Sequence, residues 1–289
     1  MSGLRLWALT ALAMMAFAAN SVLNRMAVGP GWIAPMDFAL LRLMAGAGVL
    51  ALILGLRQMR GGVVWSGWRG RGAGVFGLCT YLAGFSLAYL DLAAGIGALI
   101  LFGSVQVTMF SGAVLAREHL PLTRWVGAGL AFAGLVWLVA PGGTEVPLAG
   151  AAAMACAGVG WGLYSLAGRG AVDAVAATAW NFILALPVLA GGVVLLSPPD
   201  WGGMEARGVW LALVSGAVTS GLGYALWYGV VPHLGAARAG VAQLTVPMIA
   251  ALGGALMLGE GMSLRFALAS LLILGGVALA SRQSALPRR

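Results

Sequence analysis

The side chains with a spacing suited to ligand binding lie inside long apolar stretches. Phe17, Asn20 and Asn24 follow one another at intervals of three and four residues, so they share one face of a helix. A matching face on a later stretch carries Trp161 and Tyr164. Amides, hydroxyls and rings within an apolar cleft are typical of small-molecule sites. The predicted substrate-binding residues are Phe17, Asn20, Asn24, Tyr81, Ser104, Trp161, Tyr164, Thr219, Tyr224 and Gln243.

Taken one at a time, these residues fit helix packing as well, because buried amides and hydroxyls in lipid find partners on neighbouring helices. As a set they predict a cleft for a neutral or zwitterionic ligand with an apolar side chain. Such a cleft suits a phosphate or a multivalent ion poorly. Aromatic amino acids are an attractive hypothesis, since tyrosine and tryptophan could stack on them.

Ionisable groups are nearly absent from the interiors of these stretches, and the carboxylates fall at or near their ends. This pattern argues against a proton relay built from buried carboxylates. Glu118 and Glu260 are expected to have a structural role, capping helix ends or pairing with arginine, with substrate contact as the alternative. Arg42 is the exception, about two turns inside an apolar stretch. We expect it to reach the outer headgroups or to pair with Asp37; the alternative is a contact with a substrate carboxylate.

The sequence offers no constellation for catalysis. His119 and His233 are the only histidines, both in connections, and no histidine, cysteine and aspartate cluster has metal-ligand spacing. Cys79 and Cys156 read as small buried hydrophobic residues. We therefore predict neither an enzyme nor a bound metal or cofactor; an integral-membrane enzyme is the less favoured alternative.

Composition places these residues in a membrane. Of 289 residues, 61% are hydrophobic and only 8% are charged, whereas soluble domains carry roughly 25% charge. The mean hydropathy is +0.98. A bilayer core of about 30 Å needs about 20 apolar residues per helix. We predict an all-α membrane protein with ten transmembrane helices at residues 4–27, 34–56, 71–90, 93–115, 121–140, 148–168, 175–196, 207–231, 235–258 and 263–282.

The arginines predict the orientation. All 16 basic residues are arginine, and no run of them forms a nucleic-acid groove despite the net charge of +8. With a cytoplasmic amino terminus, only Arg25, Arg207 and Arg265 fall on the far side. Cytoplasmic loops carry the excess of basic residues. We therefore expect a multi-pass protein of a bacterial-type inner membrane with both termini in the cytoplasm, whose partners are the lipid bilayer and a small-molecule substrate.

Two stretches of the chain repeat each other at a shift of 142 positions, Leu92–Leu138 and Leu234–Ala280. The shift places Glu118 on Glu260. Five predicted helices separate equivalent points, and an odd number of crossings puts them on opposite sides of a membrane. Inverted repeats are typical of transporters with a site between the halves. The predicted repeats are residues 1–145 and 146–289, rocking by alternating access around a site lined by the first, third, fourth, sixth, eighth and ninth helices.

The second repeat also carries a recognisable motif. Leu258-Gly-Glu-Gly-Met-Ser-Leu264, followed by Leu274-Gly-Gly-Val277, resembles the signature of EamA-type transporters of the drug/metabolite transporter superfamily. The first repeat has a looser copy at Ala116–Leu122. The resemblance implies a ten-helix inner-membrane carrier, and many members export amino acids or other small metabolites.

The exporters of aromatic amino acids are the branch that the resemblance suggests. Drugs, lipid-linked intermediates or nucleotide sugars are the alternative cargo. Members often have a proline in the fourth and the ninth helix; here Pro247, a predicted hinge, is present but its counterpart is Val105. The two halves are therefore expected to bend unequally.

Overall fold

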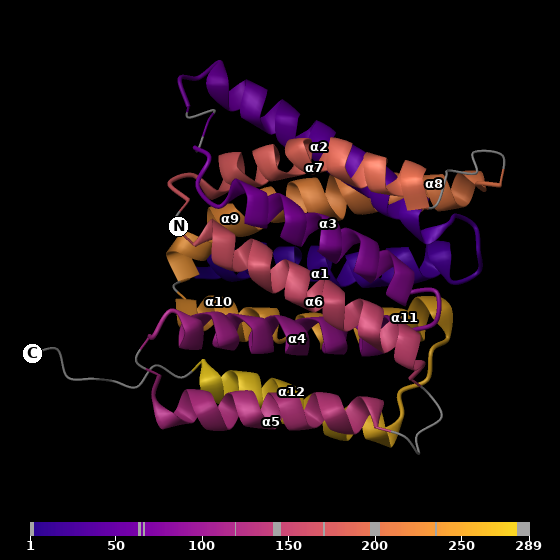
Figure 1. Cartoon of the computed structure of the whole chain (residues 1–289), viewed down its shortest axis with the longest axis vertical. Coiled ribbons are helices and arrows are strands. Elements are labelled where there is room, and N and C mark those ends of the chain that lie inside the picture. Colours follow the sequence, from indigo (N-terminus) through magenta and orange to yellow (C-terminus); the bar gives the residue numbers. More distant parts are fainter. Residues whose placement is uncertain are drawn as a thin grey trace, which may run out of the picture.

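The computed structural model describes residues 3–62, 65, 67–118, 120–140, 146–169, 171–196, 203–234 and 236–281. Within these ranges the chain is helical and has no strand. Long helices run roughly side by side across the molecule, and the start of α1 and the end of α12 lie on the same side, at the left of Figure 1. The predicted boundary between the repeats, at residue 145, lies outside the described ranges.

The helices follow the expected apolar segments closely at most of their ends. They are α1 (Gly3–Val28), α2 (Pro35–Gln58), α3 (Arg71–Ala88), α4 (Ala94–Leu115), α5 (Leu122–Val139), α6 (Leu148–Gly168), α7 (Ala174–Leu196), α8 (Ala206–Val214), the π-helical η1 (Ser215–Leu222), α9 (Gly223–Leu234), α10 (Ala236–Gln243), α11 (Val246–Leu258) and α12 (Leu264–Ala280).

Two prolines mark where the structure refines the predicted segments. The ninth segment is broken into α10 and α11, and Pro247 stands in the first turn of α11. Proline lacks a backbone N–H and fits that position, where no helical hydrogen bond is lost. Pro232 was expected to end the eighth segment, but it lies inside α9, which continues to Leu234. It falls in the last turn, so the helix ends two residues beyond it.

Eight helical stretches of the described residues are long and apolar enough to cross a membrane by length and composition, and α12 is a shorter apolar helix. The chain is thus an all-α, multi-pass membrane protein. Apolar side chains as large as Trp210 and Leu271 are exposed on the outside of the bundle, as expected for surfaces that face lipid.

Helices that are far apart in sequence pack closely through glycine. α5 lies beside α12 at the bottom of Figure 1. A Cβ atom built on Gly276 of α12 would be 2.6 Å from the carbonyl oxygen of Gly127 on α5. Gly77 and Gly160 bring α3 and α6 together in the same way. Small residues let helix backbones approach closely, and the resulting van der Waals packing is one of the forces that associate helices in lipid.

The α5–α12 contact predicts a sharp difference between neighbouring glycines. We expect Gly276→Ala to destabilise the protein by about 1–3 kcal/mol, because the new methyl group meets backbone atoms of α5 that cannot move aside easily. Gly275→Ala is the matched control, since a Cβ there meets nothing within 4 Å. Thermal denaturation of the purified variants in detergent measures the effect. Equal midpoints for the two variants would contradict the described packing.

Candidate functional site

A cavity of about 440 Å³ lies between the helices and opens at one end of the bundle. Its outer lining includes Arg124, Arg169 and Ser281, which stand at the ends of α5, α6 and α12. These ends lie on the side that also holds the start of α1 and the end of α2, whose last turn contains Arg57 (Figure 1). We call this side the arginine-rich face and the other side the opposite face.

A second, smaller cavity of about 30 Å³ adjoins the first. Trp161 and Gln243 line both, so the large cavity narrows into the small one at these two side chains. The remaining lining of the small cavity is Phe17, Asn20, Ser21, Tyr81, Phe85, Leu101, Phe102 and Tyr224. The combined space therefore leads from the arginine-rich face to side chains in the middle of α1 and α3.

Aromatic rings form the wall where the cavities meet. Trp161 stacks on Tyr164, with ring centroids 5.0 Å apart, and packs against Tyr81 at 4.9 Å and Tyr224 at 5.3 Å. Phe17 of α1 reaches Tyr224 at 5.6 Å. Rings from α1, α3, α6 and α9 thus converge on one surface. Such a surface binds an apolar or aromatic group of a ligand.

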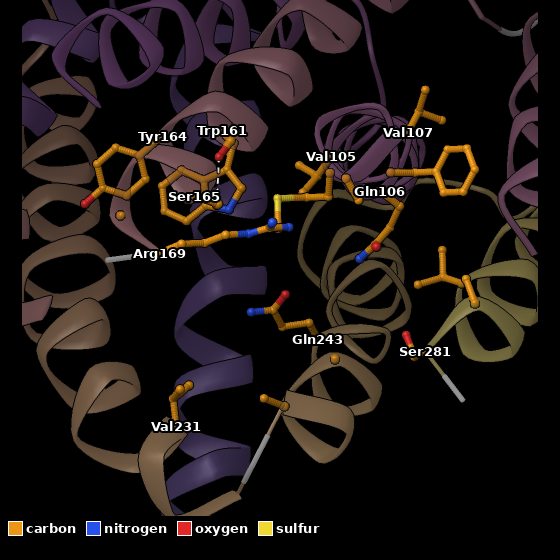
Figure 2. A pocket seen from close by; sticks show the side chains of 18 of the residues that line it. Val105, Gln106, Val107, Trp161, Tyr164, Ser165, Arg169, Val231, Gln243 and Ser281 are labelled. Carbon is orange, nitrogen blue, oxygen red and sulfur yellow. Dashed lines mark hydrogen bonds between the residues drawn. The ribbon is translucent and has the colours of Figure 1, made fainter. Parts of the chain in front are cut away.

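Polar groups face this wall. Figure 2 shows Gln106, Gln243 and Arg169 directed into the pocket from different helices. Among the described residues neither glutamine side chain has a hydrogen-bond partner. The Tyr164 hydroxyl, by contrast, donates to Thr178 Oγ1 at 2.9 Å. The two free amides can therefore donate to or accept from a ligand.

Seven of the ten predicted substrate-binding residues line one of the cavities. They are Phe17, Asn20, Tyr81, Trp161, Tyr164, Tyr224 and Gln243. Asn20 is held by two hydroxyls, because its Oδ1 accepts hydrogen bonds from Thr219 Oγ1 at 2.6 Å and Ser215 Oγ at 2.8 Å.

The other three, Asn24, Ser104 and Thr219, line neither cavity. Asn24 is fully buried and donates to Ser86 Oγ at 2.9 Å. Ser104 packs against Gly158, and Thr219 supports Asn20 from the side. In these three positions the helix-packing alternative describes the observed contacts.

The lining also includes helices that sequence reasoning left out. α5, α7 and α12 border the large cavity, whereas α1 and α3 reach only the small one. From α7 come Thr178 and Asn181, a polar pair three residues apart in an apolar helix. That spacing was a usable signal, of the same kind as the one on α1. Most of the other contributions are alanine and glycine, which carry no chemical signal.

The two repeat glutamates pair with arginine at opposite ends of the bundle. At the opposite face, Glu260 Oε1 lies 3.3 Å from Arg25 Nε, and its Oε2 accepts from the Ala94 N–H at 2.8 Å. Arg25 also donates to the Leu90 carbonyl at 2.7 Å. At the arginine-rich face, Glu118 lies 3.1 Å from Arg169, and both side chains are about 40% exposed. The first cluster is the more shielded of the two and lines neither cavity, whereas Arg169 of the second lines the large cavity.

A further pair fixes the start of α7 beside that mouth. Arg57 binds Asp173 through two hydrogen bonds of 2.6 and 3.2 Å, and Asp173 Oδ1 also accepts from the Ala176 N–H. Burial raises the pKa of this carboxyl, but the bonds from Arg57 and the Ala176 N–H lower the pKa by more, and it lies below its usual value. The carboxylate is therefore charged at neutral pH and holds the α6–α7 connection against α2.

Arg42 occupies neither of the positions expected first. Its side chain has no exposed surface, so it does not reach the headgroups. It forms no ion pair with Asp37 or with another described carboxylate. Its Nε donates to Ser220 Oγ and its Nη2 to Tyr81 OH. These hydroxyls, with the rings of Tyr81 and Phe85, surround the guanidinium and hold it inside the bundle.

The fold and the cavity define a multi-pass membrane protein with a pocket between its helices. Residues 148–282 match the EamA-like transporter family. A Pseudomonas aeruginosa protein with the name uncharacterized protein PA1977 is 45% identical over 271 residues, which cover 94% of this chain and 92% of that protein. The chain belongs to the EamA-like transporter family, which confirms the resemblance read from its motifs.

More distant relatives bear transporter names. An uncharacterized transporter of Archaeoglobus fulgidus is 25% identical over 73% of this chain and 76% of its own. The uncharacterized transporter YoaV of Bacillus subtilis is 24% identical over 87% and 89%. A solved structure described as a crystal structure of a protein superposes with a TM-score of 0.66 at 21% identity, covering 94% of this chain and 95% of that one, and shares the fold. The chain is therefore a membrane transporter, a class that points away from enzymatic activity.

Thiol labelling can test whether water fills the large cavity. In a chain with Cys79 and Cys156 replaced by serine, we expect Gln243→Cys to react with a soluble maleimide at least about tenfold faster than Val136→Cys, since a thiolate forms in water and not in lipid. Val136 is 53% exposed on the outside of α5, so it is the matched control. Labelling is measured by mass shift in membrane vesicles. Equal rates would contradict a water-filled pocket.

Proposed function

We propose that the protein exports small neutral or zwitterionic metabolites, chiefly hydrophobic or aromatic amino acids, across a bacterial-type inner membrane by alternating access. One observation carries this proposal: a pocket of about 440 Å³, walled by aromatic rings, opens at one face while an ion-pair cluster closes the other. Pockets of roughly 300–1,000 Å³ with a few directed polar groups are typical small-molecule sites.

The proposal treats the chain as ten spans in two inverted five-helix repeats. In this reading α8, η1 and α9 form one span, α10 and α11 form another, and α3 and α12 also cross. The glycine contacts support it. Gly134 approaches Leu272 and Ile273, and Gly276, its equivalent, approaches Leu130 and Ala131, which are the equivalents of those two residues. Mutual contacts of this kind are expected where α5 and α12 are related by a two-fold axis.

The glutamate clusters fit the same relation and suggest how the faces alternate. Glu118 and Glu260 are equivalent positions, and each pairs with an arginine at the end of the first helix of the other repeat, Arg169 or Arg25. In the proposed cycle the exposed pair draws together when the arginine-rich face closes. The Arg25–Glu260 pair then loosens and opens the opposite face.

The arginines support the proposed orientation of the chain in the membrane. Under the positive-inside rule the arginine-rich face is cytoplasmic, so the described state opens toward the cytoplasm, ready to load cargo. The start of α1 and the end of α12 lie on that side. Arg282, Arg288 and Arg289, which belong to the same prediction, are outside the described residues.

The two halves are expected to move unequally. Pro247 follows the break between α10 and α11, while its counterpart Val105 sits within an unbroken α4. Gln243, at the end of α10, lines both cavities. A hinge at this break would therefore move a pocket side chain directly, which α4 cannot do in the same way.

Counterflow in liposomes tests the proposed substrate class. Proteoliposomes loaded with unlabelled L-phenylalanine are expected to accumulate labelled L-phenylalanine, and Trp161→Ala to slow this exchange about tenfold by removing an aromatic contact. Trp210→Ala is the control, because Trp210 is 67% exposed on α8. Exchange of a cationic dye with no movement of any amino acid would overturn the proposed substrate.

A further inference from the structure

Arg42 is a buried charge inside the membrane-spanning part of α2. It lies about 10 Å along the helix from Pro35, and it is the largest of the fully buried side chains. Bringing a guanidinium into such surroundings is costly, and a buried cation is normally matched by a carboxylate. Intramembrane charges that persist despite this cost usually serve a ligand or an ion.

The described surroundings of Arg42 contain hydroxyls and rings but no matching charge. Nε donates to Ser220 Oγ at 3.0 Å and Nη2 to Tyr81 OH at 2.8 Å. The guanidinium also lies over the rings of Tyr81 and Phe85, at 5.2 and 4.9 Å from their centroids. Among the residues that the structure describes, Nη1 has no hydrogen-bond partner. The NH₂ group at Nη1 and one positive charge therefore have no match among the described residues.

The guanidinium lies directly behind the wall of the small cavity. Tyr81, Phe85 and Tyr224 line that cavity and are also close to Arg42. Asn20, another lining residue, is bound within the same cluster, since the Ser220 hydroxyl lies 3.4 Å from its Oδ1. The Asn20 Nδ2 makes only a long bond of 3.4 Å to a backbone carbonyl. Arg42 and Asn20 thus belong to one cluster that is joined through the Ser220 hydroxyl, and each has a donor that is free or only weakly bonded.

We propose that Arg42 is the anion-binding group of this site and that it receives the carboxylate of the substrate. This inference rests on the proposed function and narrows it to monocarboxylates and zwitterions, with the apolar part of the molecule lying toward Trp161 and Tyr224. A carboxylate has two oxygens, so one can accept hydrogen bonds from Arg42 and the other from the Asn20 amide. A phosphate would need more cationic groups than this cavity provides.

A pair of ligands that differ in one charge tests the inference. 3-Phenylpropionate and 3-phenylpropanamide have nearly the same shape, and only the first carries a carboxylate. We expect 3-phenylpropionate and L-phenylalanine to stabilise the purified protein thermally, and the amide to bind about 10- to 100-fold more weakly, as for a lost charge-assisted hydrogen bond. Equal binding of the acid and the amide by the unsubstituted protein would overturn the inference.

Variants then assign this preference to Arg42. Arg42→Gln is expected to lose the preference for the acid, and Arg42→Lys to keep it at lower affinity, because lysine retains the charge without the planar fork. Arg207→Gln is the control, since Arg207 lies in an exposed pair with Glu205. If gel filtration shows that Arg42→Gln does not fold, the test uses Arg42→Lys, for which the binding of 3-phenylpropionate and 3-phenylpropanamide is compared with that of the unsubstituted protein. An acid preference that persists in Arg42→Gln would contradict the inference.

Failure of the anion-site inference and failure of the proposed function give different experimental results. If no amino acid exchanges but 3-phenylpropionate binding depends on Arg42, the amino-acid proposal fails and the anion site stands. If L-phenylalanine exchanges equally in the unsubstituted protein and in Arg42→Gln, the exporter proposal stands and the anion site fails.

Discussion

In hydrocarbon, a polar group has to find its partner within the protein, and this constraint organises the molecule. It accounts for an all-helical chain in the described ranges and for the way side chains are paired between helices. Asn20 of α1 is bound by Ser215 and Thr219 of η1, and Asn24 by Ser86 of α3. In the described part of the chain, buried polar atoms without a hydrogen-bond partner are few, and the Nη1 atom of Arg42 is one of them. The side chains of Gln106 and Gln243 have no partner within the described residues either, but they line the large cavity.

The same constraint makes the two faces differ. At the opposite face the Arg25–Glu260 pair is shielded, with 26% and 16% of the side chains exposed, and it is tied further to the start of α4 and the end of α3. At the arginine-rich face the Glu118 pairs are exposed to solvent and border the cavity mouth. Exposed ion pairs contribute little to stability, whereas shielded, hydrogen-bonded ones resist opening. In the proposed cycle, access switches when the shielded pair becomes exposed and the exposed pair becomes shielded.

Much of the fold could be predicted from the sequence, because hydropathy and proline or glycine breaks set the ends of most helices. The aromatic and amide faces of α1 and α6 were also readable from spacing, which placed Phe17, Asn20 and Trp161 at a cavity. The position of Thr219 was not, because the π-helical turns of η1 change the angle between successive side chains and so the face they occupy. The contributions of Gly127, Ala128 and Ala177 could not be read either, since a cavity forms where side chains are small.

Arg42 shows a second limit of sequence reasoning. Its depth along α2 was readable, but its partners come from α3 and η1, which are remote in sequence. The neighbouring Asp37 was the natural partner on sequence grounds. Helix packing instead surrounds the guanidinium with hydroxyls and rings, and no carboxylate in the described part of the chain matches its charge.

The account depends most directly on the two halves crossing the membrane in opposite senses. Arg117→Cys and Met262→Cys, each in a chain without Cys79 and Cys156, place single thiols in the connections that precede α5 and α12. An impermeant maleimide added to intact cells should label Met262→Cys but not Arg117→Cys. Arg117→Cys should react only after the cells are opened. Labelling of both thiols from the same side would contradict the inverted arrangement and, with it, the proposed alternation of the two faces.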